Sequence, residues 1–196
     1  MAVSAPPSPG TRGVLDRLRG RLKRGEPDGP PGPWVLLAAW GPCGYSPVAP
    51  GTVGTLGALP LFWWLRHLPL PLYLVTLAGF TALAVHAADR SGRYWKVADA
   101  SPIVVDEVVG YLVTMALFPW SWPGALAGAA LFRLFDVSKP WPASALDRLK
   151  SGLGVVLDDV VAGLYAAGAL LLLELALRAL LGCSGALPWY CAELAR

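Results

Sequence analysis

The sequence has few charged residues and few of the side chains that build metal or disulfide frameworks. Asp, Glu, Lys and Arg make up 15% of its 196 residues, against about 25% in soluble domains. Three cysteines are too few, and odd in number, for a disulfide framework. His67 and His86, the only histidines, argue against a Cys/His metal site and a Ser-His-Asp triad. A hydrophobic content of 55% excludes disorder over most of the chain and indicates a membrane protein.

The excess positive charge is confined to the first 33 residues. This arm holds six basic and three acidic residues, which accounts for the whole net charge of +3. It is rich in proline and has no apolar run before a cleavage site, so it is not a secretory signal. We interpret residues 1–33 as a solvated, disordered arm, with a short basic helix on anionic lipid as the alternative. Residues 34–196 are predicted to form a single helical membrane domain, and no nucleic-acid binding is expected.

Two apolar runs are long enough to cross a bilayer, which takes roughly 20 residues. They are residues 68–88 and residues 160–181, and the second contains Glu174 and Arg178 at a spacing that allows them to pair on one helix face. The shorter runs 53–65, 102–118 and 124–135 are tilted spans, half-helices or helices buried among the two long ones. Only helices or closed barrels satisfy the backbone in lipid. The predicted fold is therefore an all-α helical membrane protein of about four to five hydrophobic helices, the shorter or broken ones packed on the long pair.

The positions of Lys and Arg predict how the chain is oriented. If the arm is cytoplasmic and five segments cross in turn, most basic loop residues fall in 89–101 and 133–154, on the cytoplasmic side. The tryptophans divide in the same way, with Trp63, Trp64, Trp120, Trp122 and Trp189 at one interface and Trp34, Trp40, Trp95 and Trp141 at the other. The prediction is a multi-pass protein of the inner (cytoplasmic) membrane with its site facing the cytoplasm.

Two adjacent acid pairs occur in similar apolar surroundings, VVDEVVG at 104–110 and VLDDVVAG at 156–163. Carboxylates near lipid are costly and usually functional. With Asp136 from a third segment, Asp106–Glu107 and Asp158–Asp159 supply the oxygen ligands that Mg²⁺ prefers. The alternative is that the pairs are solvated helix ends. Asp147, among basic residues in a loop, is assigned no site role, and Asp89 and Asp99 are left undecided.

Two further stretches complement the acids with groups suited to phosphate. FRLFDVSKPWP at 132–142 places Arg133 and Asp136 on one helix face with Lys139 just beyond, and both cations suit phosphate oxygens. Lys139 is explained equally well as a positive-inside flank. In GYSPVAPGTVGTLG at 44–57, Gly51, Thr52 and Thr55 precede or open an apolar helix, where backbone N–H groups can receive an anion. Cys43 is interpreted as a small packing residue because no histidine is near to activate it.

The four blocks SPVAPGTVGTL (46–56), IVVDEVVGYLVT (103–114), FRLFDVSKPWP (132–142) and GLGVVLDDVVAGLYA (152–166) closely resemble the phosphatidylglycerophosphatase A family, in family order. The resemblance runs from about Trp40 to about Leu172. Two departures are Cys43, where a small or hydroxyl residue is expected, and Thr55, where serine is usual.

The resemblance implies a membrane-associated, Mg²⁺-dependent lipid phosphatase of phospholipid biosynthesis. It would hydrolyse phosphatidylglycerophosphate to phosphatidylglycerol and inorganic phosphate. The implied catalytic acids are Asp106, Glu107, Asp136, Asp158 and Asp159. Arg133, Lys139 and Thr52 stand beside them as phosphate-binding residues, joined by Gly51 and Thr55 from the glycine-rich stretch.

Our mechanistic hypothesis is attack by an activated water, with Asp106, Glu107, Asp158 and Asp159 holding one or two Mg²⁺ ions against the phosphate. An Asp nucleophile is the alternative. Two alternative functions are considered. One is a phospholipid synthase of the CDP-alcohol transferase type, but this sequence lacks the Asp-Gly and Ala-Arg pattern that such an enzyme needs. The other is a small transporter or scaffold. The transporter predicts acids spread through the membrane depth, whereas these gather on one side.

Overall fold

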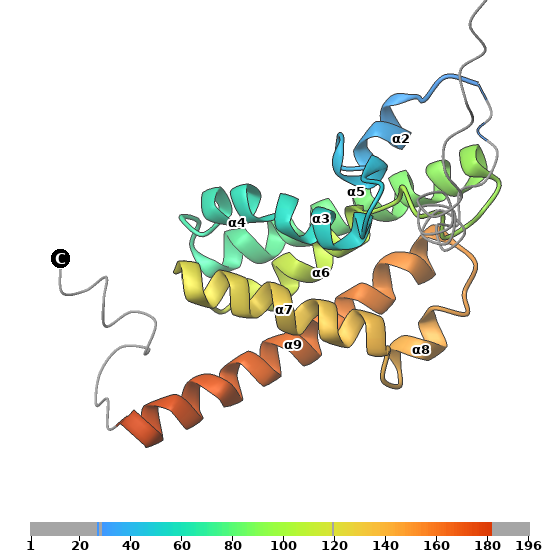
Figure 1. Cartoon of the computed structure of the whole chain (residues 1–196). Helices are drawn as coiled ribbons and strands as arrows, with labels where there is room; N and C mark the ends of the chain where they lie inside the picture. The colour runs from blue at the N-terminus through green and yellow to red at the C-terminus, as the bar shows by residue number, and fades with distance from the viewer. Residues whose placement is uncertain (1–26, 28, 119, 182–196) are drawn as a thin grey trace, which may run out of the picture.

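The computed structural model describes residues 27, 29–118 and 120–181, and all regular structure in these residues is helical (Figure 1). The predicted all-α fold is therefore confirmed. In chain order the helices are α2 (Pro33–Ala38), η1 (Cys43–Tyr45), α3 (Pro50–Gly57), α4 (Leu59–Leu65), α5 (Leu70–Trp95), α6 (Val105–Met115), α7 (Trp122–Ser138), α8 (Ala143–Leu146) and α9 (Gly152–Leu181). Most of the basic arm predicted at 1–33 lies outside the described residues, as does Trp189, so the arm stays a prediction.

Helices α5 and α9 are the two long apolar helices that the sequence predicts. With 26 and 30 residues, they are about 39 and 45 Å long. Among the described residues they alone are long and apolar enough to cross a membrane, by length and composition. Glu174 is buried on α9, but the Arg178 side chain lies outside the described part, so their pairing remains a prediction. The two helices suggest a membrane protein.

Helix ends follow local sequence signals. Pro50 stands in the first turn of α3, where its missing N–H costs nothing. The Ser121 side chain accepts a hydrogen bond from the Gly124 N–H (3.1 Å) and so caps the start of α7. Lys139 ends α7 in the left-handed conformation (φ 42°), and the following Pro140 cannot continue the helix. These signals fix where α3 begins and where α7 begins and ends, and so they position the site residues that the two helices carry.

The packed segments alternate in direction, so that one end of the molecule collects several helix termini. A cavity at one end is lined from the start of α3, the start of α6, the end of α7 and the first turns of α9. A cavity at the other end is lined from the end of α4, the start of α5 and the end of α6. The gathering of acids on one side is therefore confirmed by the fold.

The structure distinguishes among the options that the sequence left open for the shorter apolar runs. The 53–65 run is divided into α3 and α4. Helix α6 has 11 residues and is about 16 Å long, roughly half of a hydrocarbon core. Most of its side chains are buried. It is a core helix enclosed by the others, which is one of the options that the sequence left open.

Helix α6 is held by close contacts on two sides. The Tyr73 hydroxyl of α5 donates a hydrogen bond to the Leu112 carbonyl (2.7 Å). On the other side α6 crosses α9 closely: a Cβ added at Gly163 would lie 2.4 Å from the Gly110 carbonyl oxygen. The Thr114 hydroxyl donates to the Gly110 carbonyl (2.9 Å) and approaches that of Gly163 (3.3 Å). This crossing sets the distance between the two acid pairs.

The tryptophans predicted to mark the two interfaces are exposed only in part. Trp63, Trp64 and Trp122 are exposed near the end away from the acids, and Trp34 and Trp141 are exposed at the other. Trp95 and Trp120 are buried instead. Trp120 packs against Phe62 and Trp122, and Trp40 donates from its indole N–H to the Gly57 carbonyl (2.9 Å). The rings of Trp95 and Trp120 thus pack inside the protein, and the assignment of the tryptophans to two membrane interfaces stays a prediction.

Candidate functional site

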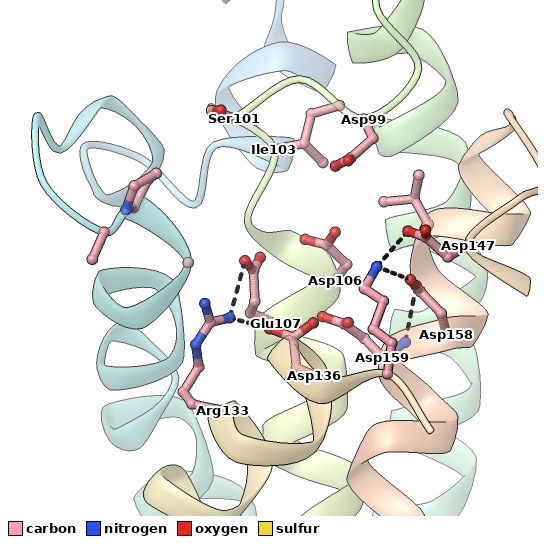
Figure 2. A pocket seen from close by; sticks show the side chains of 15 residues that line it. Asp99, Ser101, Ile103, Asp106, Glu107, Arg133, Asp136, Asp147, Asp158 and Asp159 are labelled. Atoms are coloured by element: carbon pink, nitrogen blue, oxygen red, sulfur yellow. Dashed lines mark hydrogen bonds and ion pairs between the residues drawn. The ribbon is translucent and has the colours of Figure 1, made fainter. Parts of the chain in front are cut away.

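The acids meet in a cavity of about 240 Å³ at the end of the molecule where α3, α6 and α9 begin and α7 ends (Figure 2). Its lining carries seven carboxyl groups and two cationic groups. The carboxyls belong to Asp99, Asp106, Glu107, Asp136, Asp147, Asp158 and Asp159, and the cations to Arg133 and Lys139. A pocket with this excess of negative charge repels a phosphate unless further positive charge enters with it.

Three of these acids form a compact cluster at the floor of the cavity. One carboxylate oxygen each from Asp106, Glu107 and Asp159 lies within 4.8 Å of the other two. Asp106 and Asp159 are 7% and 3% exposed. Asp106 Oδ1, Glu107 Oε2 and Asp159 Oδ2 are buried without a hydrogen-bond partner in the described part of the chain. Buried carboxylate oxygens need partners, and a cation coordinated by all three would provide one. The cluster could therefore hold a metal ion.

The two acid pairs are used differently. Asp106 and Glu107 stand in the first turn of α6, and both reach the cluster. In α9, Asp159 reaches the cluster, whereas Asp158 turns to Lys139 (2.5 Å to Nζ) and accepts a hydrogen bond from the Asp159 N–H (3.0 Å). The predicted four-carboxylate metal set is thus brought together as three, because the carboxylate of Asp158 is engaged by Lys139 instead.

Arg133 links α7 to the cluster. Its Nη1 lies 3.3 Å from Glu107 Oε1 and also pairs with Asp136 Oδ2. The predicted placement of Arg133 and Asp136 on one helix face is thus present, and Figure 2 shows both side chains directed toward the cluster. The Arg133 Nε is buried and has no partner among the described residues. The guanidinium therefore lies beside the cluster with donor capacity left for an anion.

Lys139 joins α7 to α8 and α9. Its Nζ pairs with Asp147 and with Asp158. Burial acts to lower the pKa of the Lys139 ammonium, but its hydrogen bonds and charge interactions with the two carboxylates outweigh burial and raise that pKa. Lys139 therefore stays cationic at neutral pH.

Asp147 belongs to the cavity, contrary to the prediction that it is a loop residue without a role. It lines the cavity and pairs with Lys139. This position of Asp147 could not be predicted from the sequence, because it depends on the turn after Lys139 and on the short helix α8, which bring the loop back over the site. Asp99 also lines the cavity, which places one of the two acids left undecided. Asp89 lies elsewhere, paired with Arg93 and accepting from the Gly152 N–H (3.3 Å).

The glycine-rich stretch contributes one residue of the predicted three. Gly51 lines the cavity, and a Cβ there would lie 2.1 Å from Glu107 Oε1 and 2.8 Å from Arg133 Nη1. Thr52 and Thr55 line a neighbouring, more apolar groove instead. Thr55 is buried, and its hydroxyl donates to the Gly51 carbonyl (2.9 Å). Thr52 is turned about 100° around α3 from Gly51, and Thr55 lies about one turn further from the start of the helix, so neither lines the acidic cavity.

Comparison with known proteins gives one consistent family. The family model described as phosphatidylglycerophosphatase A matches residues 36–174. The chain is 37% identical over 160 residues to phosphatidylglycerophosphatase A of Escherichia coli, covering 79% of this chain and 88% of that protein. It is 36% identical to the protein of that name from Haemophilus influenzae, over 68% of this chain and 84% of the other. A putative phosphatidylinositol-3-phosphatase of Bacteroides thetaiotaomicron is 38% identical, over 67% of this chain and 87% of that protein. No solved structure matches.

Proposed function

The chain belongs to the phosphatidylglycerophosphatase A family, and we propose that it hydrolyses phosphatidylglycerophosphate to phosphatidylglycerol and inorganic phosphate with the help of Mg²⁺. The catalytic acids of this proposal are Asp106, Glu107 and Asp159, with Asp136 and Asp158 positioning the two cations. Arg133, Lys139 and the backbone around Gly51 receive the phosphate.

The observation that carries the proposal is the set of three buried carboxylate oxygens beside Arg133 that have no hydrogen-bond partner among the described residues. Carboxylate oxygens gathered within 4.8 Å of one another suit Mg²⁺, which is commonly held by one or two protein carboxylates together with substrate phosphate. The charge of the cavity argues the same way, because seven carboxyls against two cations disfavour a phosphate that arrives without a metal.

The chain's own residues then have separate tasks. When bound, Mg²⁺ supplies positive charge against the phosphoryl group and activates water for attack. Arg133 donates bidentate hydrogen bonds to phosphate oxygens, and its contact with Asp136 fixes the plane of the guanidinium. Lys139 adds a positive charge from the other side, held by Asp158. A carboxylate of the cluster is suited to accept the proton of the attacking water.

We also propose that the protein lies in the inner membrane with this cavity on the cytoplasmic side. The support is the gathering of Arg93, Lys139 and Lys150 at the acid end, which is the positive-inside pattern. After replacement of the native cysteines, a membrane-impermeant thiol reagent should label Trp122→Cys from outside intact cells and leave Ser144→Cys unlabelled. The reverse pattern would contradict the orientation.

The test of the activity is release of inorganic phosphate from phosphatidylglycerophosphate by the purified protein in detergent. We expect release with Mg²⁺, none with EDTA, and recovery when excess Mg²⁺ is returned. Phosphatidic acid and phosphatidylinositol 3-phosphate are the comparison substrates, the second because of the name of the Bacteroides relative. Chelator-insensitive release would contradict the metal, and no release from any of the three lipids would contradict the phosphatase itself.

A further inference from the structure

A second, mostly apolar groove lies between α3 and α7 and adjoins the acidic cavity. It has a volume of about 260 Å³ and is lined by Thr52, Leu56, Leu126, Ala129, Ala130 and Arg133, among others. Arg133 lines both the groove and the acidic cavity. The groove therefore begins at the guanidinium that faces the phosphate site.

The groove runs away from the acids, toward the opposite end of the molecule. Helix α3 begins at the acid end and α7 ends there. Leu126 precedes Arg133 by two helical turns, which is about 10 Å along α7. Leu56 likewise lies more than one turn beyond Gly51 on α3. A molecule with its phosphate at Arg133 and its tail in the groove would point its tail into the depth of the membrane.

The groove is open to its surroundings and has small residues where α7 lines it. Leu56 and Leu126 are 47% and 51% exposed, and Thr52 and Ala130 are also exposed. Ala129 and Ala130 leave the space that larger side chains would fill. An exposed apolar groove that ends at a half-buried cation matches a ligand with an apolar tail and an anionic head.

We propose that this groove holds the acyl chain of the phospholipid substrate beside its glycerol, and so admits the lipid sideways from the membrane to Arg133. The proposal rests on the lipid phosphatase activity proposed above and adds the place where the apolar part binds. It predicts that activity depends on the length of the acyl chain, separately from recognition of the headgroup.

The experiment compares water-soluble substrates below their micelle concentrations. Deacylated glycerophosphoglycerophosphate probes the headgroup alone, and dibutyryl, dihexanoyl and dioctanoyl phosphatidylglycerophosphate add chain. For the unchanged protein, kcat/KM should rise with chain length by up to about fourfold per buried methylene. In Ala130→Trp the new ring fills the groove, so kcat/KM for the dioctanoyl lipid should fall at least about tenfold. Its kcat/KM for the deacylated substrate should stay within about twofold of the unchanged protein.

Ala82→Trp is the matched control, because Ala82 is exposed on α5 and lines none of the cavities described above. It should keep the chain-length dependence of the unchanged protein. Leu126→Ala is the second variant, chosen because it removes apolar surface from the groove without adding bulk. It should weaken the preference for the dioctanoyl lipid while leaving the deacylated substrate unaffected.

The outcomes separate the groove from the phosphatase activity. Hydrolysis of all four substrates at similar kcat/KM by the unchanged protein overturns the groove and leaves the proposed activity standing. Normal chain-length dependence in both Ala130→Trp and Leu126→Ala, or equal losses on every substrate in both, also overturns it. No hydrolysis of any substrate overturns the activity and the groove together.

Discussion

Gly51 lies so close to Glu107 that a Cβ on its backbone would be 2.1 Å from the Glu107 Oε1 atom. The same Cβ would lie 2.8 Å from Arg133 Nη1. Glycine at this position therefore lets α3 approach the contact between Glu107 and Arg133, which joins the acid cluster to the cation that faces the phosphate.

Gly51→Ala should consequently reduce kcat by about 100-fold, because a displacement of about 1 Å at a reacting centre has an effect of that order. Phosphate release from phosphatidylglycerophosphate, with the melting temperature measured in parallel, checks this. Gly79→Ala on α5 is the control, since a Cβ there meets nothing within 4 Å. Equal activity of the two variants would contradict the close approach at Gly51.

Asp159→Asn removes one charge from the cluster while keeping the size of the side chain. We expect turnover to fall by orders of magnitude, since charge neutralisation and positioning supply most of the catalysis of phosphoryl transfer. Glu174→Gln is the control: Glu174 is a buried acid on the same helix, about 22 Å further along it. It should retain turnover, whatever it loses in stability. If both variants were equally active, the acid pairs would be solvated helix ends.

Much of the site could be predicted from the sequence because helical spacing and burial act locally. The adjacent acids of α6 and α9 stand in apolar runs, and an acid in such a run needs a partner; Arg133 and Asp136 are separated by less than one turn. These relationships lie within single helices and do not depend on the conformation of the loops. Asp147 was missed because its place depends on the turn at Lys139 and on α8, which bring a loop residue within contact of Lys139. The role of Gly51 depends on how closely α3 packs on α6, which spacing along the chain does not encode.

Asp147→Asn tests the loop contact that the sequence did not reveal. Asp147 and an incoming phosphate compete for the Lys139 ammonium, so the loss of the carboxylate charge should favour the phosphate. Because Asp147 is partly exposed, with a side chain 44% accessible, its ion pair is worth at most about 1 kcal/mol. We expect KM to fall by up to about fivefold with kcat little changed. An increased KM would mean that Asp147 holds Lys139 in place for the substrate.

Binding of a divalent cation should be visible without turnover. A ligand that binds only the folded state stabilises it by about 2.7 kcal/mol at 100 times its dissociation constant. Thermal unfolding in detergent should therefore shift upward when Mg²⁺ is added to EDTA-treated protein. The shift should be lost in Glu107→Gln and retained in Glu174→Gln. A shift of the same size in Glu107→Gln would place the ion somewhere other than the cluster.

The crossing of α6 and α9 should control both stability and activity, because it sets the distance between Asp106 and Asp159. A Cβ at Gly163 would lie 2.4 Å from the Gly110 carbonyl oxygen, a backbone atom that cannot move independently. Gly163→Ala should therefore push the helices apart and destabilise the protein by about 1–3 kcal/mol, as overpacking of cores does. Gly168→Ala is the control on the same helix, where a Cβ meets nothing within 4 Å, and it should stabilise by about 0.5–1 kcal/mol. Denaturation in detergent gives both values. Phosphate release measured well below the melting temperature separates the effects, because Gly163→Ala should still turn over slowly when fully folded. Full activity of folded Gly163→Ala would show that the two acid segments keep their spacing without this close contact.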